Sequence, residues 1–238
     1  MKKVAGAARR AIIDYNMIQK GDCIAVGVSG GKDSLTLLTV LASLRRYIPE
    51  SFTLKAITVE MGFDGVSAEN IAGYCKKLGV EYITEKTGIA RVLFDIRKEK
   101  NPCSLCANLR RGALNNIAAA NGCNKVALGH HLDDVIETFF LSLFYEARIS
   151  CFSPVTYLDR KGITVIRPLI YANEKDIRSF AKRFALPVLH NPCPKDGNSK
   201  REYIKQLLLR LEKENPDVRQ RIFRAVKTKL LDAGKDCV

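Results

Sequence analysis

The chain has 238 residues, enough to bury a sizeable core in one domain, or in one domain with an appendage. It contains no long uncharged apolar run and no apolar core of a signal peptide, which argues against membrane insertion and secretion. We therefore expect a cytoplasmic protein with no membrane partner, whose eight cysteines stay reduced and serve as metal ligands, reactive thiols or core residues.

The formal net charge of +14 is large for a chain of this size and predicts a polyanionic partner. An anionic membrane would require a basic amphipathic helix with bulky apolar anchors, whereas the lysines and arginines here are dispersed and become dense between Lys200 and Lys229. This distribution favours an RNA with a large footprint. Solubilising charge alone is the simpler alternative.

Strand-like and helical patterns alternate along the chain. Apolar strand-like runs occupy residues 23–28, 54–59, 81–84 and 125–128, with helical periodicity between them, and a hairpin is predicted over 155–166. The alternation predicts an α/β fold with a doubly wound, mostly parallel sheet. In such sheets ligands bind beyond the carboxyl ends of the strands, near the topological switch point.

The C-terminal part has a different pattern. After Pro187 a polar loop leads to one predicted helix, and another begins near Asp217. The first of these helices carries four apolar side chains on one face: Ile204, Leu207, Leu208 and Leu211. We expect one domain over residues 1–198, which includes the cysteine site described below, and a helical extension over 199–238 that packs on it.

Residues 29–34 read Ser-Gly-Gly-Lys-Asp-Ser and directly follow the first predicted strand. The glycines free backbone N–H groups which, together with the N-terminus of the next helix, predict a phosphate-binding turn. The turn is not a P-loop, because that motif needs glycine in place of Val26 and Ser or Thr in place of Asp33. It resembles the pyrophosphate loop (PP loop) of the N-type ATP pyrophosphatases, and an ordinary strand-to-helix turn is the alternative.

Cysteines form the second candidate site. Cys103 and Cys106 have the spacing of a Cys-x-x-Cys pair at the start of a predicted helix, and such a pair can bind one metal or cluster. A lone pair is an incomplete ligand set. Cys193 is the candidate third ligand, because Asn-Pro-Cys occurs both at 101–103 and at 191–193, where proline constrains the backbone.

Two adjacent carboxylates, Asp133 and Asp134, follow His130 and His131 at another strand-to-helix junction. Capping of the helix explains one carboxylate at this position, and two are more than capping requires. The histidines could contact phosphate or polarise a carbonyl, and a structural role is equally compatible with the sequence.

Four segments together resemble the tRNA 2-thiolation branch of the ATP pyrophosphatases, closest to the 2-thiocytidine synthetase (TtcA) type. They occur in the expected order and span most of the chain: 29–34, 103–112, 128–138 and 166–169, the last leading to Cys193. The resemblance implies an adenine nucleotide alpha-hydrolase (HUP-like) fold. It also implies ATP-dependent tRNA thiolation, in which a pyrimidine C2 oxygen is adenylated and sulfide from an open [4Fe-4S] cluster replaces it, with cytidine favoured over uridine.

The resemblance also assigns cofactors, partners and residues. It implies ATP as co-substrate, Mg²⁺, tRNA and a sulfur donor that is desulfurase-derived or free sulfide, and it allows a homodimer. The implied cluster ligands are Cys103, Cys106 and Cys193, and the implied catalytic residues are Asp134, Asp133 and Arg110. The implied nucleotide-binding residues are Gly27, Ser29, Gly30, Gly31, Lys32, Asp33, Ser34, Val59 and Gly129.

Three alternatives remain at this stage. A lysidine-synthetase-like ligase, with cysteines that bind structural zinc, fits the PP loop equally well, and a 2-thiouridine synthetase shares the thiolation chemistry. The paired Cys-x-x-Cys zinc knuckles of the 2-thiouridine relatives are absent from the ends of this chain. The third alternative is a zinc-stabilised RNA-binding protein that does not turn over ATP.

Overall fold

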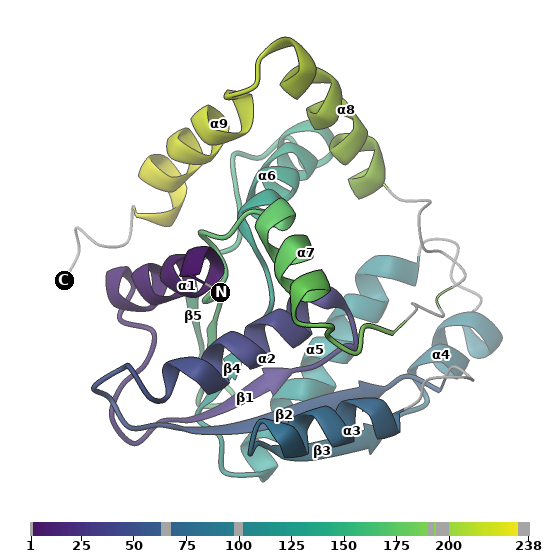
Figure 1. The fold of residues 1–238 in the computed structure, drawn as a ribbon. Coiled ribbons are helices and arrows are strands. Elements are labelled where there is room, and N and C mark those ends of the chain that lie inside the picture. The colour runs from purple at the N-terminus through teal and green to yellow at the C-terminus, as the bar shows by residue number, and fades with distance from the viewer. Residues whose placement is uncertain (1, 63–67, 98–101, 190–192, 194–199, 233–238) are drawn as a thin grey trace.

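The computed structural model describes residues 2–62, 68–97, 102–189, 193 and 200–232. A sheet of six strands crosses the molecule in the order β3-β2-β1-β4-β6-β5, and all neighbouring strands are parallel except the β5–β6 hairpin (Figure 1). The strands are β1 (Cys23–Gly27), β2 (Thr53–Glu60), β3 (Glu81–Lys86), β4 (Lys125–Ala127), β5 (Val155–Leu158) and β6 (Ile163–Ile166). The predicted doubly wound, mostly parallel sheet and the predicted hairpin are confirmed.

Helices cover both faces of this sheet. The longer helices are α1 (Lys2–Asp14), α2 (Lys32–Leu44), α3 (Ala68–Lys77), α5 (Pro102–Ala120), α6 (Leu132–Glu146), α7 (Glu174–Arg183), α8 (Lys200–Glu214) and α9 (Val218–Val226). A short α4 (Ile89–Arg91) continues into a π-helical turn η1 (Val92–Ile96), and α9 continues into η2 (Lys227–Leu231). No helix in the described part of the chain is both long and apolar enough to cross a membrane.

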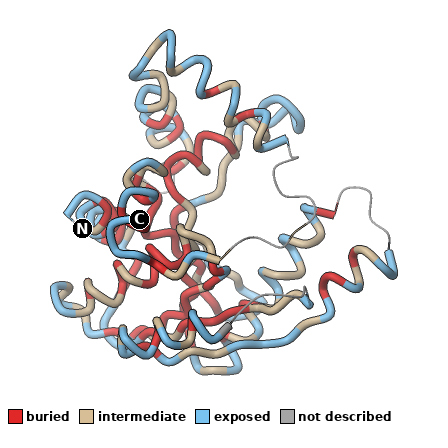
Figure 2. The backbone as a smooth tube through the Cα atoms, turned by 45° about the vertical axis from the view of Figure 1, so that its right-hand side comes forward, coloured by how far each residue is buried: buried red, intermediate tan, exposed pale blue. Residues whose placement is uncertain are grey.

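The core divides into two layers because successive strand residues point to opposite faces. Ala25 and Val126 pack against Leu114 of α5 on one face. Ile24 and Val26 join the larger core on the other face, which α1, α2, α6 and α7 share. Figure 2 shows the buried residues concentrated along the sheet and the inner sides of these helices.

Two helices, α1 and α7, are absent from the sequence-based prediction. The buried side of α1 consists of Val4, Ile12 and three alanines, a stripe of mostly small side chains on a helix of low overall hydrophobicity. Helix α7 buries only Ile177, Phe180 and Ala181, and charged residues dominate the rest. Tertiary packing therefore stabilises both helices more than their own apolar pattern suggests.

The C-terminal helices α8 and α9 pack on α6, and Ile204, Leu208 and Phe223 belong to the same core as the sheet. The predicted apolar face of α8 is broader than the observed one, because Leu211 is 36% exposed. The predicted domain boundary at 198/199 lies outside the described residues and stays a prediction.

Candidate active site

A cavity of about 590 Å³ opens at the carboxyl ends of the central strands. The sheet extends from β1 toward β2 on one side and toward β4 and β6 on the other, so the switch point lies between β1 and β4. The cavity lies at this point. The lining comes from six elements and their connecting loops: Gly27, Val28, Ser29, Asp33, Ser34, Ile57, Val59, Ala107, Arg110, Arg111, Leu114, Leu128, Gly129, His130, Asp134, Thr138, Phe152, Arg167 and Arg201.

The PP loop turns sharply between β1 and α2. Gly30 has a φ of +80°, in the left-handed region that favours glycine. The Ser34 hydroxyl closes the loop: it accepts a hydrogen bond from the Ser29 backbone N–H at 3.2 Å and donates one to the Gly31 carbonyl at 3.0 Å. The N–H groups in the first turn of α2, which have no intrahelical partners, therefore lie next to the cavity and can bind an anion.

The two charged residues of the loop have different surroundings. Asp33 lines the cavity, and its buried Oδ1 atom has no hydrogen-bond partner among the described residues. The ammonium group of Lys32 contacts Asp33 at 3.0 Å and Glu174 of α7 at 3.2 Å. Asp33 Oδ1 lies 3.7 Å from His131 Nε2, and the lysine of the loop is held by two carboxylates.

Gly129, which follows β4, packs directly against the backbone of the PP loop. A Cβ atom at this position would lie 3.0 Å from the Asp33 carbonyl carbon and 3.1 Å from the Ser34 nitrogen. Backbone atoms cannot rotate away as the end of a side chain can, so a larger residue would displace the loop. This close approach is the physical reason for glycine at 129.

Gly129→Ala is expected to weaken ATP binding roughly tenfold, because overpacking costs about 1–3 kcal/mol and here distorts the phosphate-binding turn. Gly112→Ala is the matched control, since nothing lies within 4 Å of a Cβ there and alanine favours the interior of α5. Calorimetric titration with ATP measures both. Equal affinities in the two variants would contradict the role of Gly129.

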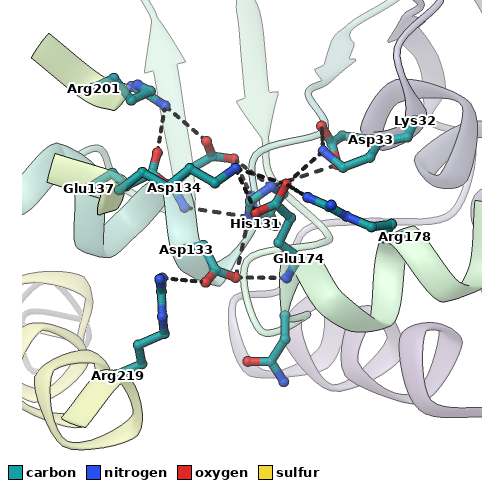
Figure 3. Close-up of polar contacts among 12 residues, drawn as sticks. Lys32, Asp33, His131, Asp133, Asp134, Glu137, Glu174, Arg178, Arg201 and Arg219 are labelled. Atoms are coloured by element: carbon teal, nitrogen blue, oxygen red, sulfur yellow. Dashed lines mark hydrogen bonds and ion pairs between the residues drawn. The ribbon is translucent and has the colours of Figure 1, made fainter. Parts of the chain in front are cut away.

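Asp134 lies at the start of α6 and lines the cavity. Figure 3 shows its carboxylate in contact with Arg201 and His131. Its carboxylate accepts a hydrogen bond from the His131 backbone N–H at 2.9 Å and pairs with Arg201 at 2.9 Å. The His131 side chain accepts from the Asp134 backbone N–H, which completes a reciprocal cap. The carboxylate therefore caps the helix and also faces the cavity.

Asp133 has a different environment. It is buried and lies outside the described cavity lining. Its carboxylate pairs with Arg219 of α9 at 2.8 Å and accepts a hydrogen bond from the Glu174 backbone N–H at 2.7 Å. The geometry thus favours Asp134 as the carboxylate available to a ligand, while Asp133 joins α6 to α7 and α9.

The sequence analysis did not identify three candidate functional residues: Arg201, Glu137 and Glu174. Arg201, in the first turn of α8, lines the cavity and contacts Asp134 and, at 3.7 Å, Glu137. Burial raises the pKa of Glu137 to about 7, and the nearby Asp134 adds to this effect. The one sequence signal for Arg201 is that it belongs to the basic run that begins at Lys200. No local pattern predicts that a residue so late in the chain lies next to α6.

Glu174, the third of these candidates, begins α7 and joins the PP loop to α8. Its carboxylate contacts Lys32 at 3.2 Å, Arg178 at 3.0 Å and Lys205 of α8 at 3.0 Å. Burial raises the pKa of Glu174, but the hydrogen bonds and charges of Lys205 and Lys32 outweigh burial and lower that pKa to about 2.

Glu174→Gln is expected to lower the melting temperature at pH 7, with a difference from the wild type that shrinks on acidification. The folded pKa lies below the ordinary value of 4.5, so the ionised carboxylate stabilises the fold above about pH 4.5 and loses this effect as the pH falls toward 2. Melting curves of both proteins between pH 7 and pH 2.5 measure the difference. A difference independent of pH would contradict the ion-pair origin.

The implied cluster ligands lie near the N-terminal end of α5 and on the loop after α7. Cys103 is exposed, whereas Cys106 and Cys193 are half-buried. Burial raises the pKa of Cys106, the charges of Cys193 and Cys103 raise it further, and Arg110 lowers it. Cys106 therefore lies within electrostatic range of the other two thiols and of Arg110. No set of three His, Cys, Asp or Glu side chains among the described residues is already spaced for a metal ion.

The other implied residues are distributed as follows. Arg110 of α5 lines the cavity, as do Gly27 and Val59 at the ends of β1 and β2. Of the PP loop, Ser29, Asp33 and Ser34 line it, whereas Gly30, Gly31 and Lys32 form the turn behind them. The structure thus brings the nucleotide-binding set, Arg110 and Asp134 to one cavity.

The fold and the cavity define a nucleotide-binding α/β protein of the PP-loop type. A family profile described as a PP-loop domain matches residues 4–212. The tRNA-cytidine(32) 2-sulfurtransferases of Geobacter metallireducens and Geobacter sulfurreducens are both 42% identical to this chain, over 94% of it and 89% of each relative. The chain belongs to the PP-loop ATP pyrophosphatases and, within them, to the tRNA-cytidine(32) 2-sulfurtransferase family, as the sequence motifs predicted.

A solved structure agrees with this assignment. The U34-tRNA thiolase NcsA from Methanococcus maripaludis, determined with its [4Fe-4S] cluster, superposes with a TM-score of 0.78. The two chains are 27% identical, and the match covers 94% of this chain and 76% of the thiolase.

Proposed function

We propose that this protein is a tRNA-cytidine(32) 2-sulfurtransferase that replaces the C2 oxygen of cytidine 32 with sulfur at the expense of ATP. The observation that carries the proposal is the cavity, where the PP loop and Asp134 meet Arg110, which lies one turn of α5 after Cys106. The relatives with this activity in their names share 42% identity with nearly the whole chain.

The chemistry requires both a nucleotide site and a sulfur site. A pyrimidine carbonyl oxygen is a poor leaving group, so O2 first attacks the α-phosphorus of ATP and pyrophosphate leaves. Sulfide then attacks C2, and the former carbonyl oxygen leaves with AMP. The N–H groups of the PP loop and of the first turn of α2 are suited to hold the departing pyrophosphate, because they point at a bound anion without needing to reorganise.

Mg²⁺ fits the cavity through its carboxylates. The buried Asp33 Oδ1 has no hydrogen-bond partner in the described chain, and Asp134 lines the same cavity. Carboxylate oxygens are the ligands that Mg²⁺ prefers, together with water and phosphate oxygens. When bound, the ion would neutralise phosphate charge. Asp33 and Asp134 would orient it toward the PP loop.

Cys103, Cys106 and Cys193 are the proposed holders of a [4Fe-4S] cluster. The donor set fits in chemical kind, because such clusters bind cysteine thiolates. With three protein ligands, a bound cluster would keep one iron without a protein ligand and would supply the sulfide for the reaction. Arg110 follows Cys106 by four residues and lines the cavity. Its charge can stabilise negative charge that develops there.

The substrate partner is tRNA. A net charge of +14 and the basic side chains of α8 and α9 suit a phosphate backbone. The cytoplasmic location, a desulfurase-derived or free sulfide donor and a homodimer remain predictions.

Anaerobic incubation with ATP, sulfide and a tRNA transcript that carries cytidine 32 tests the function. Nucleoside mass spectrometry is expected to find 2-thiocytidine, and AMP is expected to form in equal amount. A transcript with uridine 32 is the matched control, and one with uridine 34 tests the alternative that the archaeal neighbour suggests. Sulfur incorporated only at uridine 34, or lysine incorporated at cytidine, would overturn the proposal.

A further inference from the structure

Arg167, which directly follows β6, is a buried cation in the wall of the cavity. Only 7% of its surface is exposed, and it lines the cavity. Its guanidinium group donates hydrogen bonds to His130 Nδ1 at 3.3 Å, to the Ser153 carbonyl at 2.6 Å and to Thr156 Oγ1 at 3.2 Å. Phe152 lies beside it, with the ring centroid 5.0 Å from Cζ.

None of these acceptors carries a negative charge. Burial lowers the pKa of His130 to about 4, so its imidazole is neutral at pH 7. Burial also lowers the pKa of Arg167, to about 10, which leaves the guanidinium charged at neutral pH. Within the described part of the chain no Asp or Glu forms an ion pair with Arg167, whereas Arg201 in the same cavity is paired with Asp134 and Glu137.

A buried charge without a counter-charge is costly, and proteins normally pair such groups with an opposite charge or use them to bind one. The neutral hydrogen bonds orient the guanidinium but leave its charge uncompensated. Arg110 and Arg111 line the same cavity, which makes it more attractive still to an anion. An anionic ligand of the cavity would supply the missing charge.

We propose that Arg167 anchors a second phosphoryl-binding subsite, separate from the PP loop. Strand β4 lies between β1 and β6, so Arg167 is two strands away from the PP loop, roughly 10 Å at the usual strand spacing. The subsite therefore accepts a phosphoryl group other than the one bound by the PP-loop N–H groups. This inference rests on the proposed function, under which two sources are present: the nucleotide α-phosphate, retained in AMP, and a phosphodiester of the tRNA.

Affinities of Arg167→Gln for ATP, for AMP and for the cytidine-32 transcript test the subsite and distinguish its two sources. Loss of a charge-assisted hydrogen bond is expected to weaken the bound source about 10–100-fold. Weaker binding of ATP and AMP with unchanged binding of tRNA would identify the nucleotide α-phosphate as the group bound at the subsite. Weaker binding of tRNA with unchanged binding of ATP and AMP would identify a phosphodiester of the tRNA. Arg45→Gln is the control, because Arg45 is half-buried and, like Arg167, donates to neutral acceptors, here the carbonyls of Leu78 and Gly79 at a distant site.

Arg167→Lys provides a second test if the glutamine variant does not fold. Lysine keeps the charge but loses the planar fork, so we expect the affinity for the same source to fall at least about fivefold, with a melting temperature that confirms folding. Affinities within about twofold of the wild type for all three probes, in a folded variant, would overturn the inference. If the wild type binds ATP and tRNA but forms no 2-thiocytidine, the proposed function fails while the subsite is still tested.

Discussion

Cys106→Ala is expected to abolish tRNA thiolation, with a fall in turnover of at least about 100-fold, since loss of even an outer partner of a metal site commonly costs 10–100-fold. Cys106 is the half-buried thiol whose pKa responds to Cys103, Cys193 and Arg110, so its removal breaks the proposed ligand set at its centre. ATP binding should persist, because Ser29, Asp33 and Ser34 of the PP loop line the cavity whereas Cys106 is not part of its described lining.

Iron and acid-labile sulfide, measured on anaerobically purified protein, give a readout that does not depend on activity. The wild type is expected to contain about four of each per chain, and the Cys106→Ala variant much less. Cys75→Ala is the matched control, since this thiol of α3 is fully buried in the core, away from the proposed ligand set. One zinc per chain without labile sulfide would instead favour the structural-zinc alternatives.

Asp134→Asn is expected to lower the rate of pyrophosphate release about 10²–10³-fold, the usual effect of removing one preorganised electrostatic group from an active site. Asparagine can still accept the hydrogen bond from the His131 N–H, so the cap of α6 should survive. The melting temperature should therefore change little, and the loss should appear in turnover at saturating ATP.

Asp133→Asn provides the contrast. This substitution leaves the half-buried Arg219 with Glu212 as its one remaining ionic partner among the described residues, so we expect a loss of about 1.5–3 kcal/mol in the free energy of unfolding. Denaturant titration measures the stability, and pyrophosphate release measures the turnover. If Asp133→Asn reduced turnover more than Asp134→Asn did, the assignment of the two carboxylates would be reversed.

Much of the fold could be predicted because its signals are local. The buried strand before Ser29, the glycines of the PP loop and the alternation of strands and helices each act over a few residues. The missed helices α1 and α7 show where this reasoning stops. Alanines bury little apolar area on their own, and they contribute to the stability of a helix only when another surface packs on them.

The sequence by itself determined the type of chemistry: a phosphate-binding turn, a reduced Cys-x-x-Cys pair with a third cysteine, and a basic surface for a polyanion. Each of these features depends on residue types and short spacings, which can be read directly from the sequence. Only the tertiary structure separated Asp133 from Asp134 and brought Glu174 and Arg201 to the PP loop and α6. It also left Arg167 buried without a counter-charge. These relations depend on distances between remote segments, because charge pairing and burial are properties of the folded surroundings and not of any local pattern.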